Sequence, residues 1–347
     1  MTSPAKKILI IKPSALGDIV LALPALTALR KSFPQARISW LVRQEYAELL
    51  RGHPDLNEII LFDRRLLGKW WCRKKAFVNL LGLLRHLREE RFDLVFDFQG
   101  LFRTGFFARA TGCRERIGMA NARELAHLFY TRKIPQDYSC IHLVDYYLKM
   151  AEEAGAQKEK PEFKFPENAG AVEAVKGVLS ENNVNCENYV VLVPSAARKE
   201  KLWPIERFAQ LADKITAKFG SSIVATGTQA EREYIDTLVK TAQTAVANLA
   251  GKTSISELTA LLKNASLVVS NDTGPGHIAA GLGVPMVMIF GPVNPARLRP
   301  YNKPDCIAAV EPNTMEMAIG SSDPRYDISN ITVEQVFEKV SEQLSKV

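Results

Sequence analysis

The chain has 347 residues, enough for about two domains that each bury a core of their own. Hydrophobic residues make up 47% and charged residues 24%, with a mean hydropathy of -0.07, values that are ordinary for a soluble globular protein. The net charge of +7 and the pI near 9.1 favour an acidic partner: nucleic acid, an anionic membrane, or a phosphorylated or carboxylated substrate.

Cysteine, histidine and apolar patterning exclude several classes of protein. The five cysteines are odd in number and include no C-x-x-C pair, which predicts reduced thiols in a cytosol. The five histidines show no metal-type spacing, so a zinc site is not expected. No apolar run reaches the roughly 18 residues that span a bilayer, and Ile8–Ile11 is too short for the core of a signal peptide. We therefore expect a cytoplasmic protein.

Strands and helices alternate through the first half of the chain. Apolar runs predict strands at residues 8–11, 38–42, 58–62 and 93–98. Helical patterns run from Asp18 to about Lys31 and at residues 45–51, 80–90, 102–110 and 142–154. A strand, turn, helix and strand in succession form a βαβ unit, which implies a parallel sheet. An irregular polar stretch begins at Ile117.

The same series restarts after residues 156–170, a stretch rich in Lys, Glu and Pro that is the candidate linker. The expected strands lie at residues 189–193, 222–226, 265–269 and 285–290. The expected helices lie at residues 171–181, 204–219, 230–242, 258–263 and 278–283. Capping boxes at Ser254-x-x-Glu257 and Thr332-x-x-Gln335 begin two helices, and the second helix has one apolar face.

Both halves begin in the same way, because Ile11-Lys-Pro-Ser-Ala15 and Leu192-Val-Pro-Ser-Ala196 each follow a first strand. We predict an α/β fold of two Rossmann-like domains whose parallel sheets face one another across a cleft, with ligands at the carboxyl ends of the strands. The N-terminal domain would span residues 1–160 and the C-terminal domain residues 171–328. Residues 329–347 would form an amphipathic helix that packs back on the N-terminal domain.

The stretch Ser270-Asn-Asp-Thr-Gly-Pro-Gly-His277 lies between an expected strand and an expected helix. Free N–H groups at a helix N-terminus attract phosphate, so one hypothesis is a site for a nucleotide diphosphate. The alternative is a glycine-rich turn that only joins the two elements. The sequence Gly274–Ala279 formally fits G-x-G-x-x-[GA], but Pro275 occupies the turn and no acid follows about 20 residues later, as NAD binding requires.

Three charged residues follow strand ends. A carboxylate at Asp18, near a helix N-terminus, should stay ionised and can accept a proton from a hydroxyl; the alternative is a plain N-cap. Lys201 can neutralise a diphosphate leaving group, and the alternative is a solvated loop lysine. Glu231 can hold ribose hydroxyls, and the alternative is a solvated residue in the first turn of a helix.

Residues 64–75 combine lysines and arginines with Leu66, Leu67, Trp70 and Trp71. The stretch fits a solvated surface, a site for an anionic substrate, or a membrane interface. Nucleic acid is a fourth option, but no nucleic-acid motif accompanies the charge, so we expect no nucleic-acid partner.

Five stretches of the chain match one family of enzymes. They are Lys12-Pro-Ser-Ala-Leu-Gly-Asp18, Phe92-Asp-Leu-Val-Phe-Asp-Phe-Gln-Gly100, the I-G-M, A-R-E and L-F-Y-x-R-K sequences within residues 117–133, Lys201-x-Trp-Pro204, and Asn271-Asp-Thr-Gly-x-x-His277. With them the chain resembles the ADP-heptose–lipopolysaccharide heptosyltransferases, most closely the heptosyltransferase I group, nearly from end to end. The set together is specific to that family, whereas no single stretch is.

The resemblance implies a GT-B fold in which the C-terminal domain holds the nucleotide donor and the N-terminal domain the acceptor. It implies inverting transfer of heptose from ADP-heptose to a Kdo residue of the lipopolysaccharide inner core, without a metal or other cofactor. It also implies a Kdo-lipid A acceptor, a monomer, and a place on the cytoplasmic face of the anionic inner membrane.

The same resemblance assigns roles to residues. Asp18 would be the general base and Lys201 would contact the diphosphate. Asp272 would bind donor hydroxyls, and Glu231 the ribose or nearby hydroxyls. The full donor set would be Ser195, Ala196, Ala197, Lys201, Glu231, Thr253, Asp272, Thr273, Gly274 and His277. The acceptor set would be Ser14, Gly17, Arg64, Gln99, Arg103, Arg123 and Arg132.

The chain departs from the family pattern just before the lysine motif. Ala196 and Ala197 stand where related enzymes tend to carry hydroxyl residues, so either Ser195 or backbone N–H groups would make that phosphate contact. Residues 64–75 match only in their basic character. The alternatives are a related glycosyltransferase with another nucleotide sugar or a later core acceptor, an NAD(P)-dependent oxidoreductase, and a non-catalytic nucleotide- or lipid-binding protein.

Overall fold

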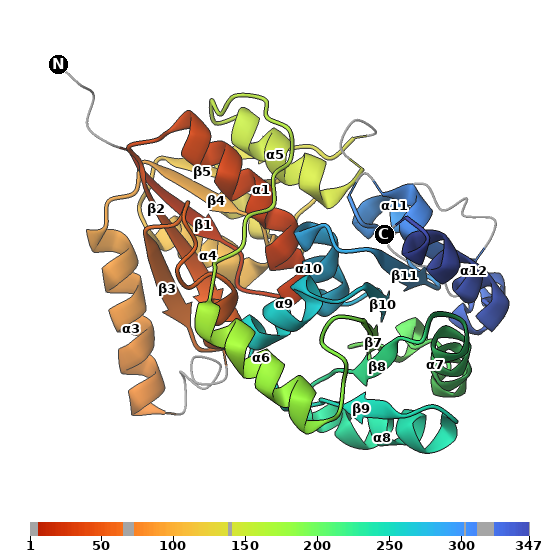
Figure 1. Cartoon of the computed structure of the whole chain (residues 1–347). Helices are drawn as coiled ribbons and strands as arrows, with labels where there is room; N and C mark the ends of the chain where they lie inside the picture. The colour runs from red at the N-terminus through yellow and green to blue at the C-terminus, as the bar shows by residue number, and fades with distance from the viewer. Residues whose placement is uncertain (1–5, 65–72, 138–140, 302, 311–322, 347) are drawn as a thin grey trace. The chain divides into compact units, whose positions relative to one another are not determined.

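The structure is a computed structural model that describes residues 6–64, 73–137, 141–301, 303–310 and 323–346 (Figure 1). The chain divides into two compact units, Met1–Glu167 and Asn168–Val347. Each unit contains a six-stranded parallel sheet. No helix in the described part of the chain is long and apolar enough to cross a bilayer.

The first sheet has the order β3-β2-β1-β4-β5-β6. Its strands are β1 (Lys7–Ile11), β2 (Arg37–Arg43), β3 (Glu58–Phe62), β4 (Leu94–Asp97), β5 (Glu115–Met119) and β6 (Arg132–Ile134). The strand order reverses between β1 and β4, where Ile8 pairs with Leu94. Open parallel sheets bind ligands outside the carboxyl ends of the strands at such a switch point.

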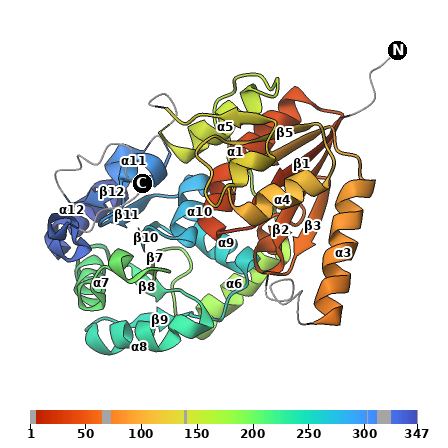
Figure 2. The same cartoon turned by 180° about the vertical axis from the view of Figure 1, so that it is seen from behind.

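Helices cover both faces of the first sheet (Figures 1 and 2). On one face α1 (Leu16–Ser32) packs with α5 (Leu143–Glu152), and on the other α3 (Lys74–Glu89) packs with α4 (Phe102–Ala110). Two 3-10 helices, η1 (Gln44–Leu49) and η2 (Ala126–Phe129), join strands. Helix α1 is almost wholly buried, whereas α3 buries only one narrow stripe and exposes the rest.

The second sheet has the order β12-β11-β10-β7-β8-β9 and reverses between β7 and β10. Its strands are β7 (Tyr189–Val193), β8 (Ser222–Ala225), β9 (Val246–Asn248), β10 (Leu267–Asn271), β11 (Met286–Phe290) and β12 (Ile307–Ala309). The two units therefore share one topology, since each sheet places its fourth strand beside its first. The switch point of the second unit lies between β7 and β10.

The helices of the second unit again form two layers. They are α6 (Ala169–Glu181), α7 (Ile205–Phe219), α8 (Arg232–Thr241), α9 (Ile255–Lys263), α10 (Gly274–Leu282), α11 (Pro295–Leu298) and α12 (Val333–Leu344). The 3-10 helices are η4 (Lys199–Lys201), η5 (Gln229–Glu231), η6 (Pro304–Cys306), η7 (Pro324–Tyr326) and η8 (Ile328–Asn330). Helices α7, α8 and α12 pack together, as do α6, α9 and α10.

The last helix differs from its expected place. Val333, Val336 and Val340 of α12 are at most 5% exposed and belong to the core that α7 forms with the second sheet. The apolar face of α12 is thus buried within the second unit, which corrects the expectation that it packs back on the N-terminal domain. Its capping box is confirmed, because Thr332 Oγ1 accepts a hydrogen bond from the Gln335 N–H at 3.2 Å.

Candidate active site

Asp18 lies in the first turn of α1, just beyond the carboxyl end of β1. The N-cap position is held by Ala15, so the alternative that Asp18 is an N-cap is wrong. Asp18 Oδ2 accepts a hydrogen bond from Lys12 Nζ at 3.2 Å, and the two side chains are 37% and 3% exposed. A half-exposed carboxylate is therefore held by a buried ammonium group.

Lys12 carries its charge in spite of its burial. Burial lowers the pKa of Lys12, but the Asp18 carboxylate and Tyr147 outweigh that effect and leave the pKa above its ordinary value. Lys12 Nζ lies 5.8 Å from the centre of the Tyr147 ring, which adds a cation–π contact. Lys12 was not singled out from the sequence, although it directly follows the first strand within the stretch that matched the family.

The loops on either side of the first switch point are joined. Gln99 follows β4, and its Oε1 accepts a hydrogen bond from the Ser14 N–H at 3.4 Å. The buried Asp97 orients this turn by accepting from the N–H groups of Gln99 at 2.9 Å and Gly100 at 3.1 Å. Ser14, Gln99 and the buried Gly17 therefore lie at the same sheet edge as Asp18.

Three arginines gather at the carboxyl ends of neighbouring strands. Arg43 ends β2, Arg64 follows β3, and Arg103 lies in the first turn of α4. Burial lowers the pKa of Arg103, and the charges of Arg64 and Arg43 lower it further, while Glu124 opposes them. The guanidinium groups are thus close enough to repel one another, which suits a site for carboxylates or phosphates. We call Arg43, Arg64 and Arg103 the arginine cluster.

The other two arginines expected at the acceptor lie elsewhere in the first unit. Arg123 follows β5 at the carboxyl edge, where its N–H donates to Gly100 O at 2.9 Å. Arg132 opens the short strand β6 opposite Ile117 of β5, and its guanidinium group pairs with Glu153 at 3.0 Å. An acceptor-binding role for Arg132 stays a prediction. The rest of the basic stretch, residues 65–72, lies outside the described residues.

In the second unit Lys201, Asp272 and His277 form one charged group. Lys201 Nζ donates to Asp272 Oδ2, and His277 Nε2 lies 3.2 Å from Asp272 Oδ1. Asp272 is 4% exposed and His277 5% exposed, while Lys201 is 18% exposed. Both carboxylate oxygens of Asp272 are therefore engaged by side chains of the protein.

The environment of Asp272 favours its ionised form. Burial raises the pKa of Asp272, but the hydrogen bond and charge of His277, together with Lys201, outweigh burial and hold the pKa below its ordinary value. His277 Nδ1 is buried and has no hydrogen-bond partner among the described residues. A buried polar atom without a partner is costly, and it marks a place where a ligand can bind.

Helix α10 begins at the carboxyl end of β10. Thr273 is its N-cap, and Gly274 and Pro275 are its first residues. Gly274 and Gly276 therefore belong to the helix and not to the preceding turn expected from the sequence. A Cβ on Gly276 would lie 2.7 Å from Ser270 Oγ, so only glycine allows this close approach. The nine-residue helix therefore presents free N–H groups at the switch point.

Asn271 connects the strand before α10 to the loop that carries Lys201. Its Nδ2 donates to Pro194 O at 2.8 Å, and its Oδ1 accepts from the Trp203 N–H at 3.3 Å. Trp203 is fully buried and packs edge-on against Phe208. Asn271 and Trp203 thereby fix the backbone on both sides of the Lys201–Asp272 contact, and sequence reasoning gave neither a role.

Ser195 and Glu231 converge on Gly227, which follows β8. A Cβ at Gly227 would lie 2.9 Å from Glu231 Oε2 and 3.3 Å from Ser195 Oγ. Glu231 Oε2 also accepts from the Thr228 N–H at 2.6 Å, so the residue closes a capping box. Ala196 and Ala197 follow Ser195 at the surface, and Thr253 precedes the N-cap of α9.

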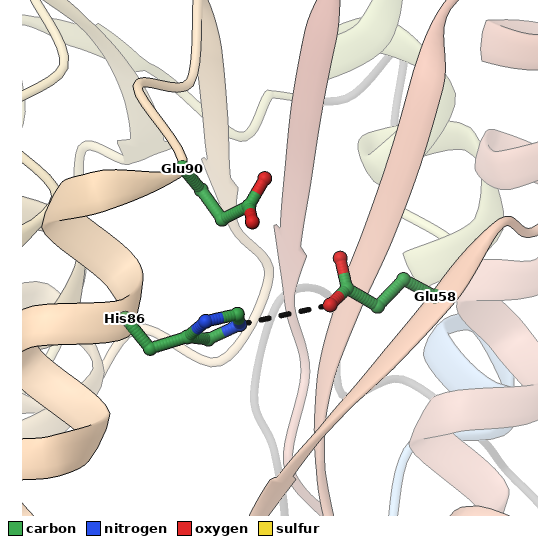
Figure 3. Close-up of side chains that lie close together, drawn as sticks. All are labelled: Glu58, His86 and Glu90. Atoms are coloured by element: carbon green, nitrogen blue, oxygen red, sulfur yellow. Dashed lines mark ion pairs between the residues drawn. The ribbon is translucent and has the colours of Figure 1, made fainter.

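One further cluster carries potential metal ligands (Figure 3). His86 Nε2 lies 3.6 Å from Glu58 Oε1, and the Glu90 side chain faces them. Both carboxylates already have cationic partners, Arg37 for Glu58 at 3.3 Å and Lys7 for Glu90 at 3.1 Å. Because Lys7 and Arg37 begin β1 and β2, the cluster lies toward the amino edge of the first sheet, away from the carboxyl edge that carries Asp18.

Comparison with known proteins identifies relatives over the whole length. The family model "Glycosyltransferase family 9 (heptosyltransferase)" matches residues 80–324, more than half of the chain. The chain is 26% identical over 323 residues to the lipopolysaccharide core heptosyltransferase OpsX of Haemophilus influenzae, covering 92% of this chain and 88% of that protein. It is 26% identical over 342 residues to lipopolysaccharide heptosyltransferase 1 of Escherichia coli K12, covering 96% and 99%.

A solved structure with a similar fold is the E. coli heptosyltransferase WaaC with ADP-2-deoxy-2-fluoro heptose. Its TM-score is 0.75 at 25% identity, and the match covers 97% of this chain and 99% of that chain. The likeness confirms the expected GT-B arrangement of two parallel sheets, and the family match confirms the expected resemblance and a glycosyltransferase activity over the oxidoreductase alternative. The chain belongs to glycosyltransferase family 9, the heptosyltransferases.

Proposed function

We propose that the protein transfers heptose from ADP-heptose to a Kdo residue of the lipopolysaccharide inner core, with inversion at the anomeric carbon. The observation that carries the proposal is the half-exposed Asp18 carboxylate held by the buried Lys12 at the first switch point. The relatives named as lipopolysaccharide heptosyltransferases support the choice of donor and acceptor.

Asp18 acts as the general base of this reaction. As the acceptor hydroxyl oxygen attacks the anomeric carbon, its proton passes to Asp18 and the bond from that carbon to the diphosphate oxygen breaks. Inversion needs a single in-line attack, so one base suffices and no covalent intermediate forms. The hydrogen bond from Lys12 Nζ orients the carboxylate of Asp18 for this proton transfer.

The second unit stabilises the departing ADP. Lys201 and the N–H groups at the start of α10 offer positive charge to the diphosphate as it gains negative charge. Asp272 holds Lys201 and His277 in place, and each of its oxygens has one such partner and can accept a further hydrogen bond from a donor hydroxyl. Ser195, Glu231 and Thr253 contact the ribose or phosphates.

The arginine cluster binds the carboxylates and phosphates of the acceptor, with Ser14, Gln99 and Arg123 at the same edge. The protein supplies the positive charge at both ends of the reaction, so we propose that it needs no metal or other cofactor. The rate should then be unchanged after chelation with EDTA. Because a Kdo-lipid A acceptor is anchored in a bilayer, the protein contacts the anionic inner membrane from the cytoplasmic side. It works there as a monomer and has no nucleic-acid partner.

The test is the release of ADP from ADP-heptose in the presence of a Kdo-lipid acceptor. The wild-type protein should release ADP, and Asp18→Asn should slow the release by about 10²–10⁴-fold, the usual contribution of a general base. Glu334→Gln is the matched control, because Glu334 is also a first-turn carboxylate, on α12, and is 73% exposed. It should release ADP at the wild-type rate.

Full activity in Asp18→Asn would refute the assigned base. A panel of other nucleotide sugars and of acceptors truncated after different core sugars tests the substrates. Faster turnover with another donor, or only with an acceptor that already carries heptose, would replace the proposed reaction by that of a later core enzyme.

A further inference from the structure

The exposed large hydrophobic side chains are concentrated on one part of the molecule. Among the described residues they all belong to the first unit, and each is 39% to 66% exposed. They are Leu61, Phe77, Val78, Leu81, Phe102, Phe106, Leu125 and Leu128. Scattered single apolar residues are normal on a surface, but a group confined to one region marks an interaction site.

Three of these residues form a stripe on α3. Phe77 and Leu81 are one helical turn apart, and Val78 lies beside them, with exposed fractions of 44%, 48% and 55%. Helix α3 meanwhile buries Ala76 and Leu87 against the sheet, so the stripe lies on a different side of the helix. The exposed side of α3 therefore carries apolar side chains in its first two turns.

The neighbouring elements continue the apolar surface. Helix α4 packs beside α3 (Figure 2). Its side chains Phe102 and Phe106 are exposed. Phe102 contacts Phe129 of η2 edge-on, with ring centres 5.2 Å apart, and Leu125 and Leu128 around η2 are exposed. We call α3, α4 and η2 with these side chains the apolar face.

Positive charge borders the apolar face at the start of α3, while the acidic Glu124 lies beside α4. Exposed basic residues Arg73, Lys74 and Lys75 begin α3, and neither the first two turns of α3 nor the whole of α4 contains an acidic residue. Apolar side chains rimmed by lysine and arginine bind anionic lipid surfaces, because the rings enter the boundary of the bilayer while the cations meet the headgroups. The same charge disfavours a second copy of this face, which would bring the lysines together.

The position of the face fits this partner. In a parallel sheet each crossover helix begins at the carboxyl edge, so the first turns of α3 and α4 lie at the edge that carries Asp18 and the arginine cluster. We propose that the apolar face docks on an anionic phospholipid surface and thereby presents the arginine cluster to an acceptor anchored there. The inference rests on the proposed lipid-anchored acceptor for its purpose, but the docking itself is independent of catalysis.

Vesicle binding without any substrate tests the docking. The full chain should sediment with vesicles that contain phosphatidylglycerol and not with vesicles of phosphatidylcholine alone. Phe77→Gln with Leu81→Gln removes apolar surface, and Lys74→Glu with Lys75→Glu reverses charge where acids suit a helix N-terminus. Each pair should weaken the binding by at least about tenfold.

Lys176→Glu with Lys240→Glu is the control, since it makes the same charge change on exposed residues of the second unit. It should bind vesicles as the wild type does. All three pairs should release ADP at the wild-type rate with a soluble acceptor fragment, so a failure of the proposed chemistry is seen separately from a failure of docking.

Three results would overturn the inference. The first is wild-type protein that does not bind anionic vesicles, and the second is face variants that bind them as tightly as the control does. The third is a wild-type dimer in light scattering that Phe77→Gln with Leu81→Gln converts to a monomer, because the face would then be covered by a second copy.

Discussion

At the scale of single residues, the two switch points use the same device: a carboxylate paired with a lysine of its own unit. Asp18 pairs with Lys12, and Asp272 with Lys201. The sequence indicated Asp18 and Lys201 because each follows an expected strand end, and the family resemblance indicated Asp272. Lys12 was missed because its contact with Asp18 depends on how the chain turns between β1 and α1, and not on a helical or strand period.

The contact between Lys12 and Asp18 should hold the base in position. Lys12→Met removes the buried ammonium group, so the Asp18 carboxylate loses the hydrogen bond that fixes its orientation. We expect kcat/KM to fall by at least about tenfold, because proton transfer needs the base within hydrogen-bond reach of the acceptor hydroxyl.

Lys7→Met is the control, because Lys7 pairs with Glu90 at the amino edge of the same sheet. Its kcat/KM should equal that of the wild type. A wild-type kcat/KM in Lys12→Met would contradict this role of Lys12.

Asp272 should couple stability to pH. The folded state holds the pKa of Asp272 below its ordinary value of 3.8, so the unfolded chain takes up the proton first as the pH falls. The stabilisation is thus fully present above about pH 4 and is lost as the pH falls through the folded pKa. We expect Asp272→Asn to lower the free energy of unfolding near pH 7 by at least about 1 kcal/mol, with the deficit shrinking at acid pH.

Urea unfolding from pH 7 down to about pH 3 measures this difference. The exposed Asp305→Asn should show no deficit at any pH. A deficit for Asp272→Asn that stays constant down to the lowest pH would contradict the linkage.

At the scale of elements, burial decides what a sequence can reveal. Central apolar strands such as β1 and β7, buried on both faces, were predicted within a residue of their bounds. Strands β5, β6, β9 and β12 were not, because strands at the outer parts of a sheet carry a weaker apolar pattern and three of these four have only three residues. The start of α10 was placed too late, since its Gly and Pro residues are typical of turns although Pro is also favoured at a helix start.

The close packing of α10 on β10 predicts a cost for any side chain at Gly276. A Cβ there would lie 2.7 Å from Ser270 Oγ and 2.9 Å from Met288 Cε, so Gly276→Ala should destabilise the fold by about 1–3 kcal/mol through overpacking. Gly177→Ala on α6 is the control, since nothing lies within 4 Å of its added Cβ. That change should stabilise by about 0.5–1 kcal/mol. Equal stabilities of the two variants in urea unfolding would contradict this account of the packing.

At the scale of the whole molecule, one topology occurs twice and serves two purposes. Each unit reverses its strand order beside its first strand, and each carries its charged pair there. The sequence predicted the repetition from the similar stretches after β1 and β7. It did not predict that the exposed large hydrophobic side chains, as far as the structure describes the chain, all lie in the first unit. We infer that donor binding belongs to the second unit alone.

Donor binding by the second unit alone predicts how ADP should change the stability of two variants. ADP should stabilise the wild-type protein against thermal unfolding by about 2.7 kcal/mol at a hundredfold excess over its Kd, because it binds the folded state only. Asp18→Asn should retain this stabilisation although its turnover is lost, since Asp18 lies in the first unit. Lys201→Ala should lose most of the stabilisation, because the diphosphate loses its lysine and Asp272 is left with only His277. Equal stabilisation of the two variants by ADP would contradict the inference that the second unit alone binds the donor. Loss of the stabilisation in Asp18→Asn but not in Lys201→Ala would place donor binding in the first unit, and would also contradict the assignment of Asp18 as the base.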